Sequence, residues 1–170
     1  MSLHLTIHKP KDVILLGQGN GYKISGKLGS VFLNIRGVIS IVDDITLNLV
    51  SINKKYLMLN LKLIKQCLRG VSVGYKKRLR LKGLGYTAEI LENSVLSLKL
   101  GFSNKINIDI PSGIIVKIKK RRIIYFLGFD LLEITKFMAF IRSYRVPDCY
   151  KGKGILYQKE IVRLKPGKKN

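Results

Sequence analysis

The chain has 170 residues, of which 46% are hydrophobic, so it can bury a core as one ordinary domain or two small ones. Its 32 Lys and Arg residues against 10 Asp and Glu residues give a net charge of +22, which predicts an anionic partner: nucleic acid, an anionic membrane surface or an acidic protein. The composition argues against a membrane span, a signal peptide, and a zinc or disulfide framework built on Cys67 and Cys149.

The first half reads as strands followed by one helix. The glycine-rich segment 17–21 predicts a turn, and Gly70 is expected to stop the helix. Strands are expected over 12–16, 21–35, 38–42 and 45–50. The helix is indicated by apolar residues at helical spacing, namely Leu57, Leu61, Ile64 and Leu68.

Two apparent motifs in this half are weak. Residues 21–28 resemble a P-loop, but Leu28 replaces the Ser or Thr that holds magnesium and no helix pattern follows, so a hairpin turn is preferred. His4 and His8 have no third ligand nearby, so no metal site is predicted. With histidines at these two positions alone, no catalytic triad is credible, and we expect neither an enzyme nor a cofactor.

The second half repeats the order of strands and helix. Asp130 and Glu133 have the spacing of a capping box at the helix start, and Pro147 ends any helical pattern. Strands are expected over 76–82, 86–91, 95–100, 105–110, 114–118 and 123–126. The helix carries an apolar stripe of Leu131, Ile134, Met138 and Ile141. The predicted fold class is α+β, with two similar small domains, 1–72 and 73–146, each a mostly antiparallel sheet packed by a helix, and a basic C-terminal extension, 147–170.

Positive charge is concentrated in the second half. Residues 75–170 carry 22 basic and seven acidic groups, against ten and three in residues 1–74. Strand alternation over 76–82 places Leu79 and Leu81 on one face and Arg78, Arg80 and Lys82 on the other, which faces either solvent or RNA. The run 117–122 is either a solvated hairpin tip or, as we prefer, a phosphate contact, through Lys117, Lys119, Lys120, Arg121 and Arg122.

The carboxyl end has the sharpest signal. Nine Lys and Arg residues and two carboxylates lie between Arg142 and Asn170. Gly152 and Gly154 permit positive φ and close approach to a phosphate, and Tyr150 and Tyr157 can stack on bases. The alternative is a flexible basic tail. We expect RNA contacts at Arg142, Arg145, Tyr150, Lys151, Gly152, Lys153, Gly154, Tyr157, Arg163, Lys165, Lys168 and Lys169.

These motifs resemble those of the ribosomal protein L6 family. The resemblance lies in P-D-C-Y-K-G-K-G-I-L-Y over 147–157, in the charged segment 160–168 and in G-V-S-V-G-Y over 70–75. It is strong after Gly70 and weaker before it. Thr87 stands where the family usually has Arg, which removes one cation contact.

The resemblance implies a non-catalytic structural constituent of the large ribosomal subunit. It implies binding to large-subunit rRNA near the sarcin–ricin loop and stalk base, beside neighbouring ribosomal proteins and docking translational GTPases, and no homo-oligomer. Heavy use of Ile, Leu, Lys and Asn favours a mitochondrial ribosome, with a bacterial cytoplasm or plastid as alternatives. A basic membrane-surface protein is the second interpretation, and a nucleotide-dependent enzyme based on the P-loop-like segment is the third.

Overall fold

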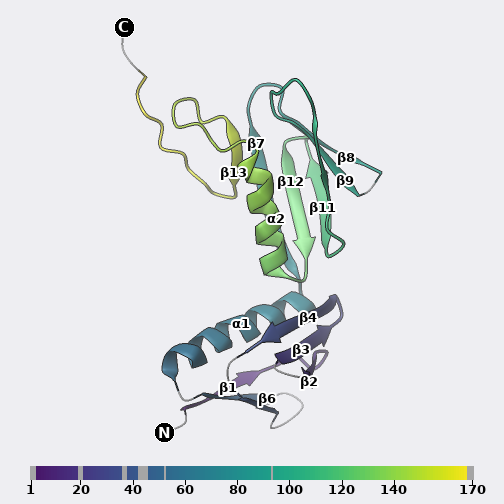
Figure 1. Cartoon of the computed structure of the whole chain (residues 1–170), viewed down its shortest axis with the longest axis vertical. Coiled ribbons are helices and arrows are strands. Elements are labelled where there is room, and N and C mark those ends of the chain that lie inside the picture. Colours follow the sequence, from purple (N-terminus) through teal and green to yellow (C-terminus); the bar gives the residue numbers. More distant parts are fainter. Residues whose placement is uncertain are drawn as a thin grey trace. The chain divides into compact units, whose positions relative to one another are not determined.

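A computed structural model describes residues 3–18, 21–35, 38–41, 46–51, 53–92 and 94–167. The chain forms two compact units (Figure 1). Unit 1 comprises Met1–Tyr75 with Gly128–Leu131, and unit 2 comprises Lys76–Leu127 with Leu132–Asn170. Two helices and several antiparallel sheets make up the described part, which confirms the predicted α+β class. Neither described helix is long and apolar enough to cross a membrane.

The described residues of unit 1 form two three-stranded antiparallel sheets and one helix. The first sheet has the order β2-β3-β4, formed by Ile14–Gln18, Gly21–Gly26 and Gly29–Asn34. The second has the order β1-β6-β5, formed by Leu3–His8, Thr46–Ser51 and Val38–Ile41. Helix α1 (Lys54–Ser72) buries Leu57, Ile64 and Leu68 in the core of the unit.

The P-loop-like segment is a hairpin, as predicted. Gly26 pairs with Gly29, and the two residues between them form the turn. The turn cluster predicted over 17–21 coincides with the connection between the antiparallel strands β2 and β3. Gly17 and Gln18 pair with Tyr22 and Gly21 at the end of this ladder, and the connecting residues 19–20 lie outside the described part of the chain.

Helix α1 ends later than predicted. Its N-cap is Asn53, whose side chain accepts a hydrogen bond from the Lys55 N–H at 3.0 Å. Gly70 lies inside the helix, where an added Cβ would come within 2.1 Å of the Phe129 carbonyl oxygen. Gly70 is thus required for close packing, and the stop is provided by Gly74, whose φ is +82° and whose N–H donates to the Arg69 carbonyl.

Unit 2 contains a four-stranded sheet, a three-stranded sheet and the second helix. The four-stranded sheet has the order β11-β12-β7-β13, formed by Ile114–Lys119, Ile123–Gly128, Tyr75–Lys82 and Gly154–Tyr157. The other has the order β10-β9-β8, formed by Ile106–Asp109, Val95–Lys99 and Thr87–Leu91. The last strand comes from the basic segment after Pro147, which is therefore part of the sheet.

Helix α2 (Leu131–Ser143) packs through the predicted apolar stripe. Ile134, Met138 and Ile141 are buried, and the Phe137 ring meets the Phe126 ring of β12 edge-on at 5.9 Å. Leu131, predicted in the stripe, is half-buried. The sheet face under this core is apolar, which leaves the opposite face of β7 for its charged residues.

Candidate nucleic-acid interface

Strand β7 divides its residues between core and solvent as the alternation predicts. Leu79 and Leu81 are buried at 0% and 2% exposure. Arg80 and Lys82 are exposed, and Arg78 is half-buried. The side chains of Arg80 and Lys82 are therefore accessible to a ligand, whereas that of Arg78 is partly covered.

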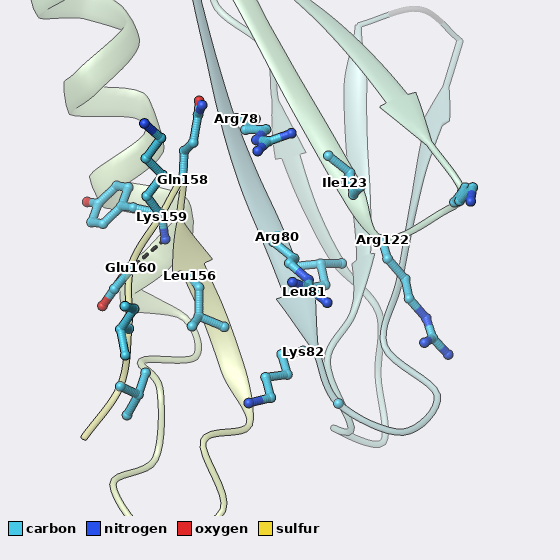
Figure 2. A pocket seen from close by; sticks show the side chains of 15 residues that line it. Arg78, Arg80, Leu81, Lys82, Arg122, Ile123, Leu156, Gln158, Lys159 and Glu160 are labelled. Atoms are coloured by element: carbon cyan, nitrogen blue, oxygen red, sulfur yellow. Dashed lines mark hydrogen bonds between the residues drawn. The ribbon is translucent and has the colours of Figure 1, made fainter. Parts of the chain in front are cut away.

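A groove of about 650 Å³ lies along this basic face (Figure 2). Its walls come from β7, from the turn between β11 and β12, and from the segment 156–162. Six cations line it: Arg78, Arg80, Lys82, Lys120, Arg122 and Lys159. Its one carboxylate, Glu160, already pairs with Arg142, so the groove presents a nearly uncompensated positive charge.

A second hollow of about 330 Å³ extends this surface toward the start of β7. It shares Arg78 and Gln158 with the first groove. Its other lining residues are Lys76, Lys77 and Tyr125. Because the Lys76 ammonium lies 4.8 Å from the centre of the Tyr125 ring, this aromatic face is occupied by a cation–π contact. We call the two hollows together the basic groove.

The turn between β11 and β12 is held in an uncommon conformation. Lys120 and Arg121 have φ of +54° and +52°, a region that costs a non-glycine residue about 1 kcal/mol or more. The Arg122 N–H donates to Lys119 across the turn at 3.3 Å, and the carbonyls of Arg121 and Arg122 accept from Ala88 and Leu81 at 2.8 Å. Backbone pairing with two other strands thus fixes the tip that carries Lys120 and Arg122 to the groove.

Only part of the basic run 117–122, predicted as a phosphate contact, lies at the groove. Lys120 and Arg122 line the groove, whereas the exposed Lys117 and Lys119 do not line either described hollow. The Arg121 guanidinium lies 3.9 Å from the Glu89 carboxylate, a weak pair because the two side chains are 75% and 42% exposed.

The glycine loop is folded tightly onto its own chain. The Asp148 carboxylate accepts hydrogen bonds from the Lys151 and Tyr150 N–H groups, which lower its pKa. The Asp148 N–H donates to the Lys153 carbonyl at 3.0 Å, and the Gly152 N–H donates to the Asp148 carbonyl at 2.9 Å. These bonds order the loop, so it is not the flexible tail that was the alternative.

Gly152 and Gly154 serve internal packing. Both are buried, with φ of +63° and +152°. A Cβ at Gly154 would lie 2.6 Å from the Pro147 Cα, and one at Gly152 would lie 3.3 Å from the Lys82 ammonium and 3.2 Å from Leu164 Cδ2. The positive φ agrees with the sequence interpretation, but the close approach is made to Pro147, Lys82 and Leu164 within the protein.

Arg142 and Tyr157 also have internal partners. The Arg142 guanidinium donates to Glu160 at 2.6 Å and lies 4.8 Å from the centre of the Tyr157 ring. Glu160 in turn accepts the Tyr157 N–H at 2.8 Å. Through these contacts Arg142 stabilises the end of β13 and the segment 156–162, which forms one wall of the groove.

The other predicted residues that the structure describes line neither of the two hollows. Tyr150 is 58% exposed, and the Arg145 guanidinium lies 5.0 Å from the Phe102 ring centre. Lys151, Lys153, Arg163 and Lys165 are exposed. The Lys165 N–H donates to the Cys149 carbonyl at 2.9 Å, which holds the last described segment to the loop. Lys168 and Lys169 lie outside the described residues.

Sequence reasoning missed Lys76, Lys77, Gln158 and Lys159. Lys76 has a signal, since it continues the alternation of Arg78, Arg80 and Lys82. Gln158 and Lys159 have none, because their place in the groove depends on β13 pairing with β7, where Leu156 lies opposite Arg80.

Comparison with known proteins agrees with the motifs. The family model described as ribosomal protein L6 matches residues 82–158. Large ribosomal subunit protein uL6 of Mycoplasmoides gallisepticum is 47% identical over 106 residues, and uL6m of Reclinomonas americana is 46% identical over 107 residues. These alignments cover 62% and 63% of this chain and 57% of each relative.

A third relative matches over nearly its full length. Large ribosomal subunit protein uL6 of Syntrophus aciditrophicus is 37% identical over 168 residues, which is 95% of this chain and 93% of the relative. These similarities confirm the resemblance and agree with the expectation of a structural, non-enzymatic protein. The chain belongs to the ribosomal protein L6 family.

Proposed function

We propose that this protein is a structural constituent of the large ribosomal subunit that holds large-subunit rRNA in the basic groove. The observation that carries the proposal is the set of eight cations that line the two hollows, beside a single carboxylate that is already paired. Such a surface matches a phosphate backbone, because each neutralised phosphate releases a condensed counterion.

The shape of the groove favours folded RNA. Its cations come from strands and a fixed turn, so their spacing is set by the sheet. Double-stranded RNA is recognised mainly by shape and by phosphate and 2′-hydroxyl contacts, which a rigid array of this kind can provide. Tyr150, Lys151 and Lys153 are exposed on the adjoining loop and extend the proposed contact. Gly152, Gly154 and Arg142 support it from within.

We place the bound RNA near the sarcin–ricin loop and stalk base, where translational GTPases dock. Support comes from the family and from the motif over 147–157, whose loop adjoins the groove: Gly152 packs close to the Lys82 ammonium. For the compartment we propose a mitochondrial ribosome, on residue usage and the uL6m relative. Cofractionation with mitochondrial large subunits tests this, and recovery exclusively with bacterial or plastid subunits would contradict it.

The groove is tested by removing two of its cations. The full chain carrying Arg80→Gln and Arg122→Gln is compared with a Lys23→Gln, Lys136→Gln control, which removes the same charge at exposed positions outside the groove. Filter binding to large-subunit rRNA is measured at graded salt. We expect weaker binding and a salt slope lower by about 1.4–1.8, from about 0.7–0.9 per phosphate.

The control should keep a slope closer to that of the unmodified chain. Equal slopes for the two double variants would show that net charge alone drives binding and would reject the groove as the site. A parallel Lys151→Ala, Lys153→Ala variant measures how much the glycine loop contributes to rRNA binding. We expect its salt slope to fall by up to about two ion equivalents.

A further inference from the structure

Helix α1 of unit 1 has a cationic face that the groove of unit 2 does not explain. It carries Lys54, Lys55, Lys62, Lys65 and Arg69, all exposed, and no acidic residue. At 3.6 residues per turn these five positions fall within an arc of about 100°, and the row from the first to the last is about 22 Å long. The buried residues of the helix, such as Leu57, Ile64 and Leu68, lie on the other side.

A hollow of about 480 Å³ adjoins the carboxyl-terminal end of this row. It lies between α1 and β1 and is lined in part by Lys65, Arg69, His8, Thr6 and Ser72. No carboxylate is among its described lining residues. Lys65 and Arg69 belong to both the row and the hollow, so the two features form one surface, which we call the α1 surface.

The charges of the α1 surface are unfavourable within the free protein. Lys54 and Lys55 occupy a first helical turn without an acidic residue, where the positive end of the helix dipole opposes them. Lys65 has like-charged neighbours three residues before it and four after it, at Lys62 and Arg69, a spacing that destabilises a helix. The ion pair between Lys27 and Asp12 in unit 1 involves none of these five residues.

We infer that the α1 surface is a second RNA contact, which binds backbone phosphates independently of the basic groove. A row of cations about 22 Å long fits a row of phosphates better than the dispersed carboxylates of a protein partner. Lys65, Arg69 and Thr6 line the hollow and are residue types that bind phosphate through charge and hydrogen bonds, and the Arg69 guanidinium also lies 5.9 Å from the centre of the Tyr75 ring. Bound phosphates also relieve the repulsion along the helix.

The test removes charge from the middle of the row in the full chain. A Lys62→Gln, Lys65→Gln variant keeps helix propensity nearly constant, and circular dichroism checks that α1 remains formed. The Lys23→Gln, Lys136→Gln chain again serves as the charge-matched control. Binding to large-subunit rRNA is measured at graded salt, and hydroxyl-radical footprinting records which RNA segments each chain protects.

We expect the α1 variant to lower the salt slope by about 1.4–1.8 and to lose one protected RNA segment. A different segment should be lost with Arg80→Gln, Arg122→Gln, so failure of one site is distinguishable from failure of the other. A slope and footprint equal to those of the control would overturn the second contact. An unchanged footprint with reduced recovery in reconstituted subunits would assign the surface to a protein partner and would also overturn it.

Discussion

Replacing Gly154 with alanine should detach the strand that closes the basic groove. Gly154 begins β13, and its φ of +152° is rarely adopted by residues with a side chain. The alanine Cβ would lie 2.6 Å from the Pro147 Cα, 2.8 Å from its nitrogen and 2.9 Å from the Val146 carbonyl carbon. All three are backbone atoms, so the clash is relieved only if the loop or the strand moves.

The expected loss of stability follows from two costs and one gain. Strained backbone costs about 1–3 kcal/mol and overpacking costs about 1–3 kcal/mol. Reduced freedom of the unfolded chain returns about 0.4–1 kcal/mol. We therefore expect Gly154→Ala to destabilise the region by roughly 1–5.5 kcal/mol, which corresponds to at least about fivefold faster exchange for amides that report on it.

Hydrogen exchange at the Ile155 amide is the direct assay, because this N–H donates to the Arg145 carbonyl at 2.9 Å. Gly85→Ala is the matched control: its φ is +72°, but no atom lies within 4 Å of the added Cβ, so it tests backbone strain without the clash. Gly167→Ala, with open space and no positive φ, should be nearly neutral. If Gly154→Ala and Gly85→Ala agree within about 0.5 kcal/mol, the packing argument is refuted.

Burial raises the pKa of the Cys67 thiol from 9.0 to about 11. The unfolded thiol loses its proton first, so stability should fall between about pH 9 and 11, and urea unfolding of Cys67→Ala should lack this component. A double-mutant cycle for Arg142 and Glu160, which are 27% and 24% exposed, should give a coupling of about 1–3 kcal/mol. The pair of Lys27 and Asp12, 68% and 59% exposed, should give less than about 1 kcal/mol, and equal couplings would contradict this reasoning.

The periodicity of the sequence correctly predicted which residues of a single strand or helix face the core. The alternation over 76–82 assigned both faces of β7 correctly, because burial of Leu79 and Leu81 leaves the outward side chains no other direction. The stripe of α2 was predicted for the same reason. Such patterns report which residues face the core, and they carry no information on which distant segment lies beside them.

The groove itself could not be predicted in this way. It requires β13 to return beside β7, more than 70 residues earlier in the chain, and this pairing brings Lys159 to the same surface as Arg80. Nothing in the sequence indicated that Arg142 pairs with Glu160, because the two residues are 18 positions apart. The close approach of Gly154 to Pro147 could not be foreseen either, because a glycine that approaches another part of the chain and a glycine that approaches RNA have the same sequence signal.

The two groove walls that flank β7, the turn between β11 and β12 and the segment 156–162, are fixed before any ligand binds. The turn at Lys120 and Arg121 keeps a strained conformation because backbone bonds from Ala88 and Leu81 hold it, and the opposite wall is anchored by Arg142 through Glu160. Preorganisation of this kind transfers the ordering cost from binding to folding. Loss of a lining cation should therefore change the salt slope, whereas loss of an anchor should weaken binding at every salt concentration with little change in slope, because the number of phosphates neutralised stays the same.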